Sequence, residues 1–114
     1  MKFDEYQQQA ITTDVYGGKP QPITSIAFVN KVLGLCGEAG EVADKIKKLQ
    51  RNQAGKVTAK DRDELVKELG DVLWYLSAIA RYLDVSLDHV AEQNLAKLFD
   101  RKARNAIKGN GDNR

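Results

Sequence analysis

Residues 37–44 read GEAGEVAD and lie in the middle of a segment whose apolar side chains recur at helical spacing. The segment predicts a long helix over about 26–49. Glycine costs about 1 kcal/mol in a helix interior relative to alanine, so the closely spaced glycines of this stretch need an explanation. Two glutamates, Glu38 and Glu41, stand between them. Glycines leave room for a close neighbour, and carboxylates offer oxygen ligands to a cation.

A shorter helix is predicted before the long one. Residues 1–22 contain a helix over about 3–15 and a linker that carries both prolines of the chain. Thr24 or Ser25 can cap the long helix that follows.

Two more helices are predicted after the stretch RNQAGKV, which breaks the helical pattern. Thr58 and Asp61 resemble a capping box at the start of a third helix that ends near residue 83. Ser86 can cap a fourth helix that ends near residue 106, and residues 107–114 are predicted to be an irregular tail. No alternation typical of strands is found, so the predicted fold class is all-α.

Composition favours one small cytoplasmic domain over residues 1–114. The chain is 42% hydrophobic, which at this length allows a modest core that oligomerisation would enlarge. A net charge of +2 does not indicate a nucleic-acid-binding protein. Cys36 is the only cysteine, and we expect it to be a small core residue in a reducing compartment. We expect no signal peptide, because residues 1–16 have neither a basic nor an apolar run, and no apolar run in the sequence reaches the roughly 18 residues of a membrane span.

The two long predicted helices have the same cross-section. Their apolar stripes consist of Leu35, Ala39, Val42, Ala43, Ile46 and Leu49 on the first, and of Leu65, Leu69, Val72, Leu76, Ile79 and Leu83 on the second. Beside these stripes lie the polar strips, with Glu38 and Glu41 on one helix and Glu64, Glu68, Asp71 and Tyr75 on the other. We expect the helices to pack as an antiparallel hairpin, so that the two acidic strips face each other.

Facing carboxylates repel one another when they lose part of their hydration. A hard divalent cation such as Mg²⁺, which takes oxygen ligands, removes this conflict. The glycines of the two helices then leave space for a close helix contact or a ligand; they are Gly34, Gly37, Gly40 and Gly70. The alternative is a solvated acidic face, in which Glu41 and Lys45 form an ordinary pair four residues apart.

The segments GEAGEVADKIKK, ELVKELGDVLWYLSAIA and NLAKLFDR resemble the MazG-like family of nucleoside triphosphate pyrophosphohydrolases, over about residues 26–104. The resemblance implies an all-α four-helix-bundle-type fold completed by dimerisation, often as a homotetramer. It also implies Mg²⁺ dependence, with Mn²⁺ as a substitute, and hydrolysis of (d)NTP to (d)NMP and pyrophosphate by water attack at the α-phosphate. The expected purpose is house-cleaning of the nucleotide pool.

The resemblance also assigns residues. The family's E-x-x-E and E-x-x-D motifs fall on Glu38, Glu41, Glu68 and Asp71, the expected catalytic metal ligands, one of which can instead orient the attacking water. The expected substrate-binding residues are Tyr75, Asn94, Lys97, Arg101, Lys45 and Lys48. For the two lysines nearest the motif acids, surface pairing is the alternative.

One departure from the family pattern concerns tryptophan. Some relatives carry one near the end of the first motif helix, where this chain has Lys48. Trp74 is turned away from the acidic strip and is expected to pack against another helix or subunit.

Other functions remain open at this level. The main alternative is a non-catalytic helical interaction module with an acidic groove. A di-iron carboxylate bundle is disfavoured because the only histidine, His89, has no glutamate three residues before it and is expected on the surface. A basic C-terminal end, from Lys97 to Lys108, is the only support for DNA binding.

Overall fold

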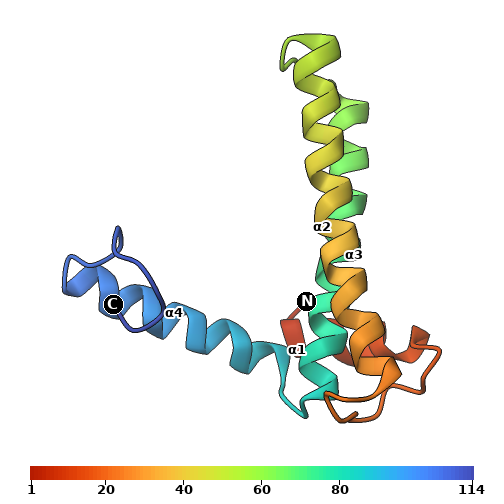
Figure 1. The fold of residues 1–114 in the computed structure, drawn as a ribbon, viewed down its shortest axis with the longest axis vertical. Coiled ribbons are helices and arrows are strands. Elements are labelled where there is room, and N and C mark those ends of the chain that lie inside the picture. Colours follow the sequence, from red (N-terminus) through yellow and green to blue (C-terminus); the bar gives the residue numbers. More distant parts are fainter.

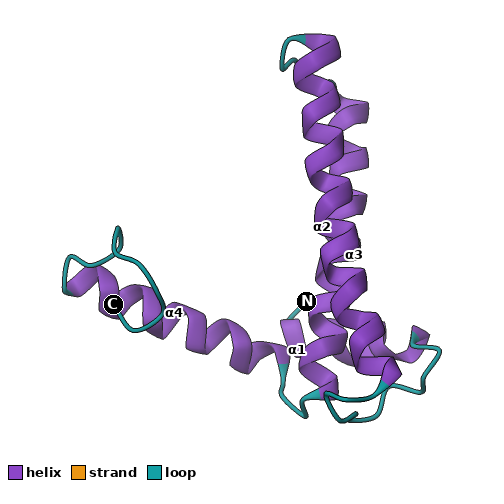
Figure 2. Cartoon of the chain, viewed as in Figure 1, coloured by secondary structure: helices purple, strands orange, loops and turns teal.

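The computed structural model describes all 114 residues, and its regular structure is entirely helical (Figures 1 and 2). The helices are α1 (Phe3–Ala10), a 3₁₀-helix η1 (Ile11–Thr13), α2 (Ile26–Gln53), α3 (Ala59–Tyr82) and α4 (Leu87–Ala103). The predicted all-α class and the four predicted helices are therefore confirmed. The tail after α4 forms turns and bends, as expected.

Local sequence signals set the helix starts. Ser25 Oγ accepts the backbone N–H of Phe28 at 3.1 Å at the start of α2. At the start of α3, Thr58 Oγ1 accepts the N–H of Asp61, and the Asp61 carboxylate accepts the N–H of Thr58, which completes the predicted capping box. Ser86 caps α4 through the N–H of His89.

The helix ends differ from the predictions by a few residues. Helix α2 continues to Gln53, and Ala54 then adopts a left-handed φ of 52°, with Gly55 following at 77°. The first helix ends at Ala10, because residues 11–13 tighten into the 3₁₀-helix. Side-chain periodicity does not reveal either change.

Helices α2 and α3 form the predicted antiparallel hairpin (Figure 1). Half-buried side chains recur on each helix at alternating three- and four-residue spacing, which is typical of a coiled-coil seam. They are Leu35, Glu38, Val42, Lys45 and Leu49 on α2, and Leu65, Glu68, Val72, Tyr75 and Ile79 on α3. Polar residues thus belong to this half-buried row, whereas the sequence placed them beside it.

The hairpin leaves much of the predicted apolar stripes uncovered. Two helices share one narrow seam, so the rest of each broad stripe has nothing to pack against within the chain. The exposed stripe residues are Ala39, Ala43, Ile46, Leu69, Leu76 and Leu83. Cys36 is also exposed, so its predicted core position is wrong for the single chain.

The N-terminal segment is fastened to the base of the hairpin by a buried ion pair. The Asp14 carboxylate accepts hydrogen bonds from the backbone N–H groups of Tyr16 and Gly18 and from the Tyr82 hydroxyl. It also forms an ion pair with Lys31, whose Nζ lies 3.1 Å from Asp14 Oδ1. The Lys31 side chain is 2% exposed, and its ammonium lies over the rings of Tyr16 and Tyr82. This network ties together the linker, α2 and α3.

Helix α1 and η1 are bound to the same base. Trp74 Nε1 donates to the carbonyl of Ala10 at 3.1 Å and to Thr13 Oγ1 at 2.9 Å. The prediction that Trp74 packs against another helix is therefore confirmed. Gln7 is buried and donates to the carbonyl of Val85, while its own side-chain oxygen accepts the N–H of Leu87.

Helix α4 leaves this body at an angle and projects away from the hairpin (Figure 1). The accessible surface is 8179 Å², whereas a compact monomer of 12.7 kDa exposes about 6200 Å². The radius of gyration is 16.8 Å, against about 13 Å for a compact domain of roughly this length. One chain alone therefore does not close a four-helix bundle. None of the helices combines the length and apolar character needed to cross a lipid bilayer.

Candidate functional site

Three of the four motif acids meet near the middle of the hairpin. Glu38 reaches across from α2, and Glu68 and Asp71 come from consecutive turns of α3. One carboxylate oxygen from each of the three lies within 4.8 Å of the others. The three-residue spacing on α3 places two acids on one face, and the antiparallel neighbour supplies the third.

Electrostatic conflict is visible at Glu38. Loss of hydration, together with the negative charges of Asp71, Glu68 and Glu41, raises the pKa of its carboxyl above the ordinary value. No lysine or arginine of the chain forms an ion pair with Glu38. A cation held between the three carboxylates would relieve this repulsion.

The donor set fits a hard divalent cation. It consists of carboxylate oxygens alone, from Glu38, Glu68 and Asp71, and includes no cysteine or histidine. Mg²⁺ and Mn²⁺ favour oxygen ligands, and Mg²⁺ commonly combines a few carboxylates with waters and substrate phosphates. Asp71 is exposed and the two glutamates are half-buried, so the cluster is open on one side to solvent.

Lys45 is held by α3 and not by Glu41. Its ammonium lies 3.6 Å from Glu68 Oε1 and 3.8 Å from Glu64 Oε2. It therefore supplies positive charge at the border of the carboxylate cluster. The pair with Glu41 that a solvated acidic face would contain is not formed.

Glu41 is exposed and stands outside the three converging acids. It borders a groove of about 210 Å³ between α2 and α3, toward the tip of the hairpin. Lys45 and Lys48 line the same groove, and Lys48 is paired with Asp44 at 2.7 Å. The two lysines expected to bind phosphate thus line one groove together with Glu41, and none of the three converging acids lines it.

Tyr75 rests directly on the backbone of Gly34. A Cβ at Gly34 would lie 2.1 Å from Tyr75 Cε1, so only glycine admits the ring at this distance. The Tyr75 ring also meets Trp74 edge-on, at 5.0 Å between centroids. The predicted role of glycine in close helix contact holds here. Close helix contact is wrong within the chain for Gly37, Gly40 and Gly70, where a Cβ would meet no atom within 4 Å, and their alternative role, space for a ligand, stays a prediction.

Gly34→Ala is expected to lower the free energy of unfolding by about 1–3 kcal/mol, because the Tyr75 ring must move from its packed position. The shift should also change Trp74 fluorescence, because the two rings are in contact. Gly37→Ala is the matched control on the same helix. It should raise stability by up to about 1 kcal/mol through helix propensity. Urea denaturation followed by fluorescence measures both; equal effects of the two substitutions would contradict the packing role of Gly34.

The substrate-binding residues predicted on α4 are not brought to the acids within one chain. Asn94 is exposed, and Lys97 and Arg101 pair instead with Asp112 of the tail. Sequence reasoning missed Asp112, because the tail has no periodicity that would place it. The only available signal was a lone acid within a glycine-rich end that follows a basic helix. His89 is exposed, as predicted.

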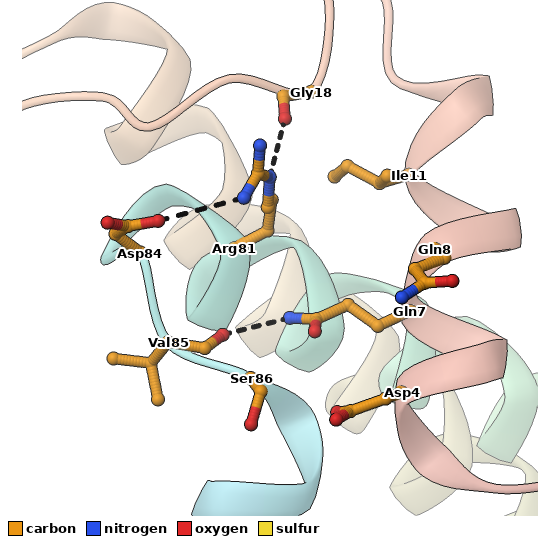
Figure 3. Close-up of a pocket in the computed structure, with 9 residues that line it drawn as sticks. All are labelled: Asp4, Gln7, Gln8, Ile11, Gly18, Arg81, Asp84, Val85 and Ser86. Carbon is orange, nitrogen blue, oxygen red and sulfur yellow. Dashed lines mark hydrogen bonds and ion pairs between the residues drawn. The ribbon is translucent and has the colours of Figure 1, made fainter.

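A separate cavity of about 480 Å³ lies at the base of the hairpin (Figure 3). Its wall includes Arg81, ten residues and therefore about 15 Å along α3 from Asp71. Arg81 Nε donates to the carbonyl of Gly18 at 2.9 Å, and Gln7 donates to Val85 (Figure 3). These polar groups hold chain segments together, so the cavity is a junction between elements.

Comparison with known proteins identifies the family of the chain. Residues 29–105 match the MazG nucleotide pyrophosphohydrolase domain, a range that contains all four motif acids. The chain is similar to the Gene 37 protein of Mycobacterium phage L5, with 46% identity over 116 residues that cover the full length of both. No solved structure matches the chain. The chain therefore belongs to the MazG nucleotide pyrophosphohydrolase family.

Proposed function

We propose that the protein is a Mg²⁺-dependent nucleoside triphosphate pyrophosphohydrolase that converts (d)NTP to (d)NMP and pyrophosphate and thereby cleanses the nucleotide pool. The observation that carries the proposal is the convergence of Glu38, Glu68 and Asp71 within 4.8 Å in a chain of the MazG family. When bound, Mg²⁺ neutralises phosphate charge and acidifies water.

The acids divide into two roles in this proposal. Glu38, Glu68 and Asp71 hold the ion, because only these three carboxylates share one position. Glu41 lies one turn from Glu38 but outside the cluster, so it is free to accept a hydrogen bond from the attacking water and orient it toward the α-phosphate.

The remaining side chains bind and orient the nucleotide. Lys45 and Lys48 border the groove beside the acids and are suited to contact phosphate oxygens. Tyr75 lies one turn beyond Asp71 on α3, and the part of its half-buried ring that Gly34 and Trp74 leave uncovered is suited to contact the sugar or base.

A second copy of the chain supplies the rest of the site. Asn94, Lys97 and Arg101 lie on a helix that points away from the acids of its own chain (Figure 1). The exposed surface exceeds that of a compact monomer by about 2000 Å², the size of a stable protein interface. A homodimer, or a homotetramer built from dimers, would cover this surface.

Hydrolysis in ¹⁸O-labelled water tests the reaction. Canonical and damaged (d)NTPs are incubated with the protein and Mg²⁺ in ¹⁸O-labelled water, and the separated products are analysed by mass spectrometry. The label should appear in the nucleoside monophosphate, because water attacks the α-phosphorus and pyrophosphate leaves. Label in the pyrophosphate would mean attack at the β-phosphorus and would contradict the proposed chemistry.

The non-catalytic interaction module predicts a different outcome. No nucleotide would then be hydrolysed, and Mg²⁺ would not raise the melting temperature. A bound ion should raise it by mass action. Thermal unfolding with and without Mg²⁺ therefore separates the two functions without depending on the choice of nucleotide.

A further inference from the structure

The C-terminal tail folds back along α4 and is held there by its own polar groups (Figure 1). Arg114 donates to the carbonyls of Ala106 and Ile107, both at 3.2 Å, and Arg104 donates to the carbonyl of Arg114. These bonds close residues 106–114 into a compact loop beside the last turns of the helix.

The loop delivers one carboxylate to two cations of α4. Asp112 Oδ1 lies 2.9 Å from Lys97 Nζ and 3.4 Å from Arg101 Nη2. The Arg101 side chain is only 5% exposed, and its Nε–H has no hydrogen-bond partner. Arg101 Nη2 also donates to the backbone carbonyls of Asp112 at 2.9 Å and Gly111 at 3.4 Å, so only Nε–H is left without an acceptor. One carboxylate therefore faces two positive charges, one of them buried beneath the tail.

Such a position suits a phosphate better than a carboxylate. A phosphate group carries more negative charge and one more terminal oxygen, and both lysine and arginine bind it through charge-assisted hydrogen bonds. The Asp112 side chain is 82% exposed, so a ligand can displace it without opening the core. Hydrogen bonding and the charge of Lys97, with help from Arg101, lower the pKa of Asp112, which is consequently ionised at neutral pH.

We propose that Asp112 is an internal competitor of the substrate: its carboxylate occupies the anion position between Lys97 and Arg101, and a phosphate of the nucleotide must displace it. This inference rests on the proposed function for the identity of the anion. The tail then tunes affinity, because the phosphate can bind only in molecules whose Asp112 carboxylate has left the two cations.

Pyrophosphate without Mg²⁺ is the probe. The carboxylates around Lys45 and Lys48 then repel the anion, which favours its binding at the α4 cations. Asp112→Asn should bind pyrophosphate up to about fivefold more tightly than the parent protein, the range expected when an exposed ion pair is removed as a competitor. Isothermal titration calorimetry measures the dissociation constants. Unchanged or weaker binding by the variant would overturn the proposal.

Three further variants separate competition from general charge and from tail structure. Asp100→Asn removes a carboxylate from the same helix, where it pairs with Arg104 and not with the anion position, and should leave affinity unchanged. Asp112→Glu keeps the charge and should restore the parent affinity. Lys97→Met added to Asp112→Asn should abolish the gain.

Turnover distinguishes failure of this inference from failure of the proposed function. With a hydrolysed nucleotide, Asp112→Asn should lower KM and leave kcat unchanged. Hydrolysis with the parent KM would refute the competitor role and keep the pyrophosphohydrolase. If Asp112→Asn bound pyrophosphate more tightly but neither protein hydrolysed a nucleotide, the competitor role would be kept and the pyrophosphohydrolase function would be refuted.

Discussion

Glu38→Gln is expected to raise the melting temperature of the metal-free protein and at the same time to abolish its increase with Mg²⁺. Glutamine keeps the shape of the side chain but removes a charge that repels Glu68 and Asp71. The same change removes an ion ligand, so Mg²⁺-dependent pyrophosphate release should fall by about two to three orders of magnitude. Differential scanning fluorimetry and a pyrophosphate assay measure the two effects.

The pH dependence of stability is an independent test of the repulsion at Glu38. The raised pKa of Glu38 means that the folded protein binds this proton more readily than the unfolded chain. In the absence of metal, the free energy of unfolding should therefore increase as pH falls through the raised pKa toward the unfolded value of about 4.3. Glu38→Gln should lose this contribution, since glutamine does not titrate.

Two other substitutions serve as controls for Glu38→Gln. Asp63→Asn removes a charge from an exposed position on α3 that makes no ion pair, and it should alter neither turnover nor the response to Mg²⁺. Glu41→Gln should reduce kcat strongly but keep the Mg²⁺-linked rise in melting temperature, because Glu41 lies outside the three converging acids. If Glu38→Gln retained full turnover, the metal centre would be assigned to the wrong residues.

The elements of the fold were predictable because local signals define them. Ser25, Thr58 and Ser86 each cap a helix within three residues of their own position, and such short-range patterns are visible in sequence. The hairpin followed from two long apolar periodicities and a short connection. Endpoints were less accurate, because the left-handed turn at Ala54 reflects backbone geometry and not side-chain pattern.

Long-range contacts were not predictable in the same way. The ion pair between Asp14 and Lys31 joins a linker to a helix, and no periodicity relates the two positions. Lys31 within the apolar run IAFVNKVLGL was the available hint that a buried lysine would need a partner. Cys36 was expected in the core because its neighbours are apolar, but the face that carries it has no cover within one chain.

The candidate site likewise contains residues whose positions follow from helical spacing and residues whose positions depend on long-range geometry. Glu38, Glu68 and Asp71 were brought together by equal helical offsets on antiparallel neighbours, which sequence can express. The position of α4 depends on the angle at residues 83–86, which sequence does not express. The site residues predicted on α4 consequently lie along a separate arm, and in the proposed homodimer the equivalent residues of a second chain would reach the acids.

The second large effect concerns stability: Asp14→Ala is expected to lower the free energy of unfolding by about 3–5 kcal/mol, because it leaves the buried ammonium of Lys31 without a counter-charge. It also leaves the Tyr82 hydroxyl and two backbone N–H groups without their acceptor. The total free energy of unfolding of a small domain is only about 5–15 kcal/mol. Chemical denaturation followed by circular dichroism measures the loss.

A double substitution shows whether the loss comes from the unpaired charge. Asp14→Leu combined with Lys31→Met removes both charges and should cost much less than the sum of the single changes. Asp100→Ala removes an exposed partner of Arg104 and should change stability by less than about 1 kcal/mol. Additive single changes would contradict the coupling of Asp14 and Lys31.

Acid titration checks the same network through its sign. Burial alone would raise the pKa of Asp14, but hydrogen bonds from Tyr82, Lys31 and two backbone amides outweigh it and hold the pKa below the ordinary value. The stabilisation is therefore complete above the unfolded pKa of about 3.9 and is lost as pH falls through the folded value. The difference in stability between the parent protein and Asp14→Ala should accordingly narrow at acid pH. A difference that stayed constant across this range would mean that Asp14 acts through packing and not through its charge.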